Sequence, residues 1–227
     1  MFKNILNAIY PTRCIICKDF TKSSFYICDE CMPKLEIITK TTCRKCGLLK
    51  ENCECNRFIY HFKGIVSPFF NEDAAKAAFY SFKFHGAIDA SKFFSNYMAQ
   101  FIKKRFKNIQ FDAVIAIPMT KIATLDRGYN QAEVLAKDIA NILNLKYHKG
   151  ALKKIKKTKI QHEQFLEQRF LNIRNVFDVS SSFNPKDKTI LLSDDIKTTG
   201  ASLDEASRIL LLNGAKEIYC ATALITK

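Results

Sequence analysis

The sequence predicts an α/β protein, with a mainly parallel sheet flanked by helices and a small cysteine-rich domain before it. Two observations predict this fold class. From residue 58 onward, short apolar runs alternate with longer runs that carry apolar residues at helical spacing. Eight of the nine cysteines fall before residue 56. Because the cysteines stop where the composition changes, we predict a boundary near residue 57 and domains at 1–57 and 58–227.

The eight N-terminal cysteines form four close pairs. The pairs are Cys14 with Cys17, Cys28 with Cys31, Cys43 with Cys46, and Cys53 with Cys55. Two thiolates on one tight turn, combined with a second such turn, complete a tetrahedral Zn²⁺ site. Sequential pairing predicts one structural zinc on the first four cysteines and a second on the last four, although the short Cys53–Cys55 spacing leaves one ion or two open. A disulfide framework is the alternative, but no secretory signal supports it.

The chain is long enough for one sizeable core, and it is strongly basic. Its 227 residues carry a formal net charge of +14, which eight thiolates around two Zn²⁺ ions would lower to +10. This excess favours polyanions such as nucleic acid, anionic lipid or multiply phosphorylated substrates, although many lysine-rich chains are merely basic and solvated. No apolar run approaches the ~18–20 residues of a membrane span. Residues 1–10 predict a short amphipathic helix rather than a signal peptide, so we expect a cytoplasmic protein.

Between residues 58 and 143, the periodicity predicts short strands, two helices, a buried strand and a third helix. The strands fall within 58–70, the helices over 72–84, 89–106 and 129–143, and the buried strand over 112–118. Basic residues at positions 103, 104, 105 and 107 end the second helix, where cations complement the helix dipole.

A loop over 119–128 is expected to follow the buried strand. It carries Arg127, whose guanidinium could bind phosphate oxygens bidentately from a strand end that faces the ligand crevice. The alternative is structural, with Gly128 shaping the turn into the next helix and Arg127 on the surface.

The stretch 189–202 is the most informative one, and it reads T-I-L-L-S-D-D-I-K-T-T-G-A-S. Residues 189–192 predict a buried parallel strand, and residues 203–212 predict a helix after a polar loop. Ligands of such sheets bind at the carboxyl ends of the strands, where this loop must lie. A last strand, with Cys220 as a small buried hydrophobe, is predicted over 217–225.

The side chains of this loop predict a sugar-phosphate site. Gly200 allows backbone N–H groups to converge on an anion at the positive end of the helix. Hydroxyl donors come from three neighbours: Thr198, Thr199 and Ser202. Asp194 and Asp195 are good acceptors for vicinal ribose hydroxyls and could help to hold a hydrated Mg²⁺ ion. The alternative is ordinary loop chemistry, with Ser202 and Glu205 forming a capping box at the helix start.

The region 146–174 is the most basic one, with nine lysines and arginines against Glu163 and Glu167. Its low apolar content predicts a mobile excursion from the sheet, which could close over a bound polyphosphate. It could equally be a solvated charge run or a surface for single-stranded nucleic acid. His162, in this region, has no partner that would make it a catalyst.

The order of these motifs resembles a known family. The stretch 189–202 resembles the phosphoribosyl pyrophosphate (PRPP) motif of type I phosphoribosyltransferases. Four cysteine pairs, I-P-M-T, R-G-Y-N-Q-A, Q-H-E-Q-F and S-D-D-I-K-T-T-G-A-S occur in the order of the ComF family, the zinc-ribbon proteins of bacterial competence. The resemblance implies a type I phosphoribosyltransferase fold and a role in DNA uptake during natural transformation. It also implies a cytoplasmic protein that acts on single-stranded DNA beside a helicase-like partner.

Carried onto the matching positions, the resemblance implies a role for each polar residue. Asp194 and Asp195 would hold the ribose hydroxyls and are the candidate catalytic residues. The 5-phosphate would be cradled by Thr198, Thr199, Gly200, Ala201 and Ser202. Arg127 and the loop after Pro118 would meet the pyrophosphate. The chain departs from the family pattern at Ser193, where an aliphatic residue is common, at Lys197, which would add a cation beside the phosphate, and at the Cys53–Cys55 spacing.

Two functions follow from these residues. As an enzyme, the protein would bind Mg²⁺ and PRPP and transfer the sugar to a nitrogen nucleophile with release of pyrophosphate. As a binding module, it would use PRPP for sensing or switching while the ribbons and the lysine-rich segment hold single-stranded DNA. Strong salt dependence of DNA binding favours the second function, and pyrophosphate release with a defined acceptor favours the first.

Overall fold

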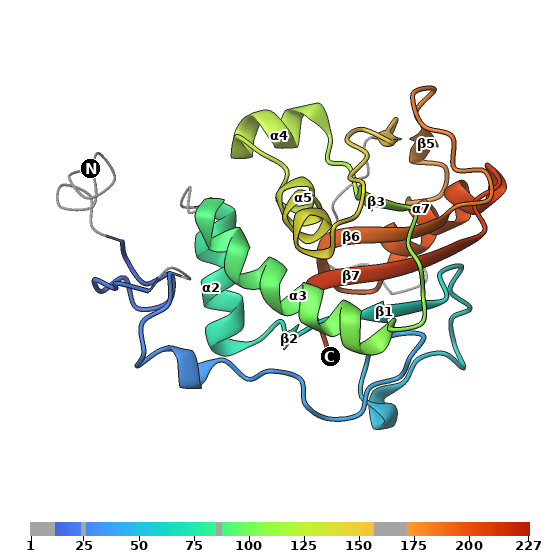
Figure 1. Cartoon of the computed structure of the whole chain (residues 1–227). Coiled ribbons are helices and arrows are strands. Elements are labelled where there is room, and N and C mark those ends of the chain that lie inside the picture. The colour runs from blue at the N-terminus through green and yellow to red at the C-terminus, as the bar shows by residue number, and fades with distance from the viewer. Residues whose placement is uncertain (1–11, 24–25, 85–87, 157–171) are drawn as a thin grey trace.

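The computed structural model describes residues 12–23, 26–84, 88–156 and 172–227, and its centre is a parallel sheet. The strands lie in the order β1 (Gly64–Val66), β7 (Glu217–Ile225), β6 (Thr189–Lys197) and β3 (Ala113–Ala116), and β2 (Phe69–Phe70) also pairs with β7 (Figure 1). Every one of these pairs is parallel. The predicted mainly parallel α/β fold is therefore confirmed.

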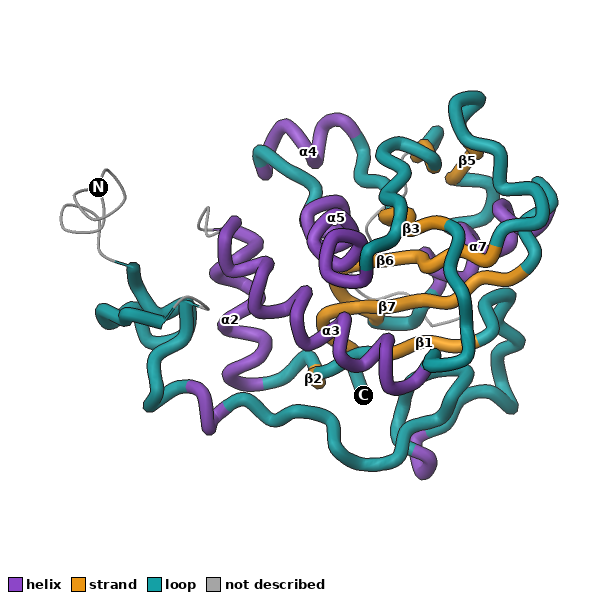
Figure 2. The backbone as a smooth tube through the Cα atoms, in the orientation of Figure 1, coloured by secondary structure: helices purple, strands orange, loops and turns teal. Residues whose placement is uncertain are grey.

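Helices cover both faces of this sheet. One face carries α3 (Ser91–Arg105) and α5 (Gln131–Leu143), with α2 (Asp73–Phe84) beside α3, and the other face carries α7 (Ala201–Leu212) (Figure 2). Short 3₁₀ turns complete the set: η1 (Met32–Lys34), η2 (Lys50–Asn52) and η3 (Ile88–Ala90). In the described part of the chain, no helix is long and apolar enough to cross a membrane.

The two faces of the sheet bury two separate apolar cores, because successive strand residues point to opposite sides. Leu191 of β6 packs into the core with α2, α3 and α5. Its neighbours Ile190 and Leu192 pack into the core with α7. Cys220 of β7 is fully buried in the second core, as the sequence predicts for a small apolar residue.

Each cysteine cluster joins a different core. Cys14 and Cys31 pack with the α2 side chains of the first core. Cys46 packs into the second core, and Gly47 beside it comes so close to the sheet that an added Cβ would lie 2.8 Å from Ile65 Cγ2. The second ribbon is therefore part of the layer that also contains α7.

The structure differs from the predicted elements in four places. Residues 121–127 form a helix, α4 (Lys121–Arg127), where a loop was predicted, because Thr120 Oγ1 caps it by accepting the Ala123 N–H at 3.2 Å. Within 58–70 only β1 and β2 are strands, and β6 runs on to Lys197. An antiparallel hairpin of β4 (Leu152–Lys154) and β5 (Phe177–Val179) was not predicted. The predicted N-terminal helix, the centre of the lysine-rich excursion and His162 lie outside the described residues.

Candidate functional site

The turn between β6 and α7 is built around Gly200. This residue is the N-cap of α7 and has a φ of +83°, a left-handed conformation that side chains other than glycine's rarely adopt. Thr199 Oγ1 accepts a hydrogen bond from the Ala201 N–H at 3.3 Å. The positive end of α7 therefore faces the polar residues that follow the strand.

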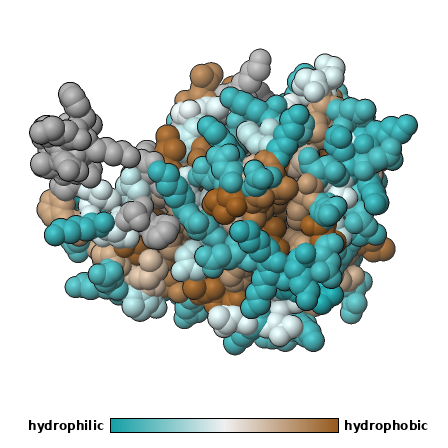
Figure 3. Space-filling view, in the orientation of Figure 1, coloured by the Kyte–Doolittle hydropathy of each residue, from teal (hydrophilic) through white to brown (hydrophobic). Residues whose placement is uncertain are grey.

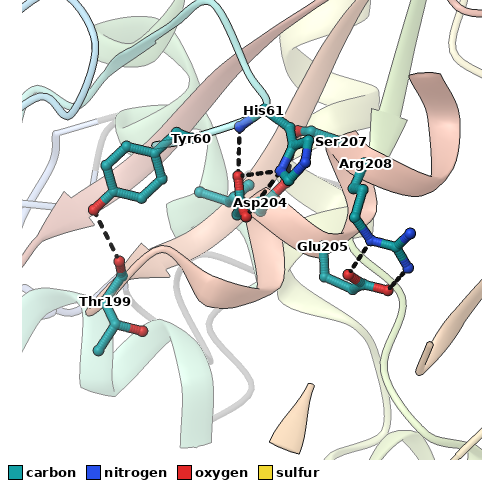
Figure 4. A network of polar contacts seen from close by, with 8 residues as sticks. Tyr60, His61, Thr199, Asp204, Glu205, Ser207 and Arg208 are labelled. Carbon is teal, nitrogen blue, oxygen red and sulfur yellow. Dashed lines mark hydrogen bonds and ion pairs between the residues drawn. The ribbon is translucent and has the colours of Figure 1, made fainter. Parts of the chain in front are cut away.

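The alternative interpretation of this loop, a capping box formed by Ser202 and Glu205, is wrong. The helix begins at Ala201 rather than after Ser202, so Ser202 lies in its first turn and is not the N-cap. Glu205 accepts the Asn175 N–H at 2.7 Å. It also forms an ion pair with Arg208 at 2.8 Å (Figure 4). Because tertiary contacts occupy Glu205, it does not return to the start of the helix.

The two acids lie at the carboxyl end of β6, within the strand rather than in the loop that was predicted. Asp194 and Asp195 are both partly exposed. Asp194 Oδ1 accepts the Asp195 N–H at 2.8 Å, and Asp195 Oδ1 accepts the Ile196 N–H at 2.6 Å. These bonds hold the carboxylates close to their own backbone, beside the start of α7.

The strand β3 ends beside these acids. Ala116 pairs with Ser193 of β6, and the Ile117 N–H donates to the Ser193 carbonyl oxygen at 2.9 Å. The loop after Pro118 therefore leaves the sheet at the same edge, as predicted. Arg127 is the last residue of α4, and its side chain lies outside the described part of the structure.

One lysine at this edge was not singled out from the sequence. Lys154 of β4 is partly buried, and burial lowers the pKa of its ammonium while the negative charge of Asp194 acts in the opposite direction. The two charged groups are thus close enough to interact. Lys154 belongs to the lysine-rich run of the sequence. Only its position in the β4–β5 hairpin, close to Asp194, distinguishes it from the other lysines of that run.

Lys197, which the resemblance predicts as an additional cation beside the phosphate, has a buried side chain. The side chain is only 1% exposed and lies beneath Gly200. Its ammonium is 5.8 Å from the centre of the Tyr60 ring. Tyr60 in turn donates its hydroxyl hydrogen bond to the Thr199 carbonyl oxygen at 3.3 Å (Figure 4).

Each set of four cysteines has the geometry of a tetrahedral zinc site. Within each set, the four sulfur atoms all lie within 4.8 Å of one another. Three sulfur pairs are 3.7 Å apart: Cys17 with Cys28, Cys43 with Cys55, and Cys46 with Cys53. Tetrahedral Zn²⁺ with Zn–S distances of about 2.3 Å has sulfur–sulfur edges of about 3.8 Å, so both sets fit the ion.

Backbone donors favour thiolates in both sets. Burial raises the pKa of Cys14, but backbone N–H groups, first among them that of Cys28, outweigh it and lower the pKa to about 6. At Cys43, burial again raises the pKa, and the N–H groups of Cys46 and Lys45 bring it down to about 7. Zinc binds thiolates rather than thiols, so these turns prepare Cys14 and Cys43 as ligands, whereas burial raises the pKa of Cys31, Cys46 and Cys55.

Two protein-family models match the chain. Residues 95–226 match the phosphoribosyl transferase domain, and residues 5–58 match the double zinc ribbon domain. The chain belongs to the phosphoribosyltransferase family. A double zinc ribbon before a phosphoribosyltransferase domain confirms the predicted resemblance to the ComF family.

Curated relatives of this chain carry names that refer to DNA uptake and DNA utilization. DNA utilization protein YhgH of Escherichia coli O6:H1 is 23% identical over 92% of this chain and 96% of its own. Competence protein ComFC of Streptococcus pneumoniae is 27% identical over 85% of this chain and 84% of its own. Competence protein F of Haemophilus influenzae is 32% identical, but the match spans only 47% of each chain.

Proposed function

We propose that the crevice at the carboxyl ends of β3 and β6 binds PRPP together with Mg²⁺. The observation that carries this proposal is the turn at Gly200, which follows the strand end that carries Asp194 and Asp195 and begins α7 without a side-chain cap from the N-cap residue. A helix N-terminus attracts phosphate, and carboxylates accept hydrogen bonds from ribose hydroxyls. The two groups therefore match the two ends of a ribose 5-phosphate.

Each residue of the crevice has a distinct part in this proposal. Asp194 and Asp195 accept hydrogen bonds from the ribose hydroxyls and hold the hydrated Mg²⁺, which neutralises charge on the pyrophosphate when it is bound. The 5-phosphate accepts hydrogen bonds from the start of α7 and its loop: Thr198, Thr199, Gly200, Ala201 and Ser202. Arg127 and the loop after Pro118 meet the pyrophosphate. Lys197 supports the loop from beneath.

As an enzyme, the protein would form a bond from an acceptor nitrogen to the anomeric carbon of PRPP while the bond to pyrophosphate breaks. Positive charge develops on the sugar, and the fixed carboxylates of Asp194 and Asp195 stabilise it electrostatically. Lys154 and Arg127 would balance charge on the departing pyrophosphate. The same crevice, without an acceptor, would serve as a PRPP-dependent switch.

The test is isothermal titration of PRPP and Mg²⁺ into the zinc-loaded protein and into Asp194→Asn/Asp195→Asn. We expect saturable binding by the wild type and a loss of about tenfold or more in the variant, because the hydrogen bonds to the ribose are charge-assisted. The matched control is Asp187→Asn, an exposed residue just before β6, at a φ of +59° that asparagine tolerates. Absence of binding by folded wild type would contradict the proposed site.

A second function, binding of single-stranded DNA, is favoured by a groove next to the sheet. The groove has a volume of about 640 Å³ and lies between the segment 38–44 and the C-terminal end of α3. Six basic residues line it: Lys40, Arg44, Lys103, Lys104, Arg105 and Lys107. Among its described lining residues, none is acidic.

The composition of this groove suits a polynucleotide strand. Arg105 is held in place by hydrogen bonds to Thr42, while Lys103, Lys104 and Lys107 are exposed. Exposed lysines meet phosphates without sequence preference, and partly exposed Phe101 offers a ring for a base to stack on. Complementarity with the helix dipole alone could explain the basic residues at the end of α3. The groove adds a second segment, residues 38–44, that faces these basic residues.

The DNA proposal is tested with Lys103→Gln/Lys104→Gln/Lys107→Gln and a fluorescent single-stranded oligonucleotide. We expect affinity to fall about tenfold at low salt, because three phosphate contacts are removed. The control, Lys149→Gln/Lys186→Gln/Lys216→Gln, removes the same charge from exposed positions elsewhere. Equal losses in both variants would mean that only the total charge matters, and the groove would be excluded as the site.

We place this activity in DNA uptake for natural transformation. The names of the relatives support the role, and a helicase-like protein is the partner that would deliver single-stranded DNA. Eight cysteines as zinc ligands require reduced thiols, which supports a location in the cytoplasm.

A further inference from the structure

Lys197 is a buried charge without a hydrogen-bond partner. Its side chain is 1% exposed, and its ammonium has no hydrogen-bond acceptor among the described residues. The ring of Tyr60, at 5.8 Å from the ammonium to the ring centre, is a weak partner. Burial of an ammonium is costly unless a negative group compensates it, so some source of negative charge is expected nearby.

The second ribbon packs next to the end of β6 that carries Lys197. Cys46 shares its core with Tyr60 and with Ile225, the β7 residue that pairs with Lys197, and an added Cβ on Gly47 would lie 3.0 Å from Ile225 Cδ1. The negative groups nearest to Lys197 therefore belong to this ribbon. Burial lowers the pKa of the ammonium, and the charges of Cys46, Glu54 and Cys55 act in the opposite direction. Four thiolates around one Zn²⁺ carry a net charge of about −2, and neighbouring N–H donors are usual around such sites. Zinc in the second cluster would therefore supply the charge that the buried ammonium lacks.

Lys197 is also tied to the loop proposed to hold the phosphate. It is the last residue of β6, and its Cε would lie 3.1 Å from a Cβ placed on Gly200. Tyr60, which lies over the same ammonium, donates a hydrogen bond to the Thr199 carbonyl oxygen. Any movement of Lys197 toward solvent would displace both the end of the strand and this loop.

A second connection runs from the linker behind the ribbon to the first turn of α7. Asp204 accepts the His61 N–H at 2.6 Å and faces the His61 ring nitrogen at 3.1 Å (Figure 4). Residues 60 and 61 thus contact both ends of the turn that begins α7.

We infer that zinc in the second cysteine cluster positions the loop 198–200 through Lys197, so that loading of this ribbon controls affinity at the phosphate site. Lys197 is a positioning residue in this inference and does not touch the ligand. Without zinc, the ammonium loses its counter-charge, leaves the interior and loosens the loop. The inference builds on the proposed PRPP site, but the loop itself can be observed without PRPP.

The experiment is hydrogen exchange of the amides of residues 199–205, combined with zinc content and PRPP titration of the same samples. Cys53→Ser/Cys55→Ser should hold one zinc where the wild type holds two, and its loop amides should exchange about tenfold faster or more. Lys197→Met keeps every cysteine and the length of the side chain. We expect the second zinc to bind about tenfold more weakly in this variant, and the loop to exchange faster.

The control is Glu54→Gln, which removes the other negative charge near Lys197 but leaves the cluster intact. It should speed loop exchange much less than Cys53→Ser/Cys55→Ser does, because the zinc cluster carries the larger negative charge, and amides of α5 serve as the internal reference for global unfolding. Unchanged loop exchange in both Cys53→Ser/Cys55→Ser and Lys197→Met would overturn the inference, as would an equal effect of Glu54→Gln. A wild type that fails to bind PRPP would contradict only the proposed ligand, because the exchange result still tests the coupling.

Discussion

Both the backbone conformation of the turn and the packing around it require a glycine at position 200. Its positive φ lets the chain leave β6 and enter α7 at once, and its missing side chain leaves room for two neighbours. An added Cβ would lie 3.1 Å from Lys197 Cε and 3.3 Å from Tyr60 Cε1. Both contacts are tighter than a side chain normally accepts, so the turn depends on glycine for two independent reasons.

We predict that Gly200→Ala destabilises the protein by more than the backbone conformation alone requires. Gly150 provides the matched control, because its φ is +66° and an added Cβ there would meet nothing within 4 Å. Gly150→Ala should cost about 1–2 kcal/mol for the left-handed conformation. Gly200→Ala should cost about 1–3 kcal/mol more, because the loop is overpacked. Urea denaturation of both variants measures the difference. Equal losses in the free energy of unfolding would show that the side chains of Lys197 and Tyr60 move aside without an energetic penalty.

Among the helices and strands, α7 is held in place by a segment that lies far before it in the sequence. Residues 60–61, just after the second ribbon, reach the first turn of α7 through Asp204. Asp204 is buried, and its carboxylate accepts the hydrogen bond from the His61 backbone N–H. His61 itself is exposed, whereas the carboxylate of Asp204 is buried and needs hydrogen-bond donors, so this bond links the ribbon to the helix.

This link predicts different outcomes for two substitutions of Asp204. Asp204→Ala removes the acceptor of the His61 N–H and should lower the free energy of unfolding by about 1–3 kcal/mol. Asp204→Asn keeps an oxygen that can accept the same bond, so its loss should be clearly smaller. Denaturant unfolding at neutral pH compares the two. If asparagine proves as harmful as alanine, the charge of Asp204 matters more than its role as an acceptor.

For the whole molecule, the positive charge is both general and locally concentrated. The formal charge of +14 attracts any polyanion, and hydrophilic residues cover much of one face, with apolar areas between them (Figure 3). The groove beside α3 brings six basic side chains from two distant segments to one place. General attraction speeds the encounter with DNA, whereas a groove fixes where the strand lies.

The salt dependence of DNA binding separates these two contributions. For single-stranded DNA, the logarithm of the binding constant falls with the logarithm of salt concentration by about 0.7 per phosphate contact. The groove variant Lys103→Gln/Lys104→Gln/Lys107→Gln should therefore reduce this slope by about 2. The control with three exposed lysines replaced elsewhere should keep the slope of the wild type. Identical slopes for all three proteins would mean that the three lysines do not contact phosphates.

Local patterns in the sequence were sufficient for the strands of the parallel sheet, most helices and both cysteine clusters, but not for the β4–β5 hairpin. The run 217–225 and the helix over 203–212 correspond closely to β7 and α7, because their apolar spacing reflects burial against one sheet. The cysteine clusters could be predicted because each cysteine pair requires only a short local turn to bring its two sulfur atoms together. The helix α4 was missed because it is short and depends on a cap at Thr120 that was not recognised.

Contacts between distant segments were decided only in the folded chain. Lys197 looks like a surface cation from its neighbours, but β6 continues through it and buries it against Tyr60. Glu205 fits a capping box in the sequence, but in the structure its carboxylate binds the Asn175 N–H and Arg208 instead. The basic groove forms because the segment 38–44 passes the end of α3. Sequence periodicity reports which face of an element is buried. Tyr60, Asn175 and the segment 38–44 lie tens of residues along the chain from the groups they contact, beyond the reach of any local pattern.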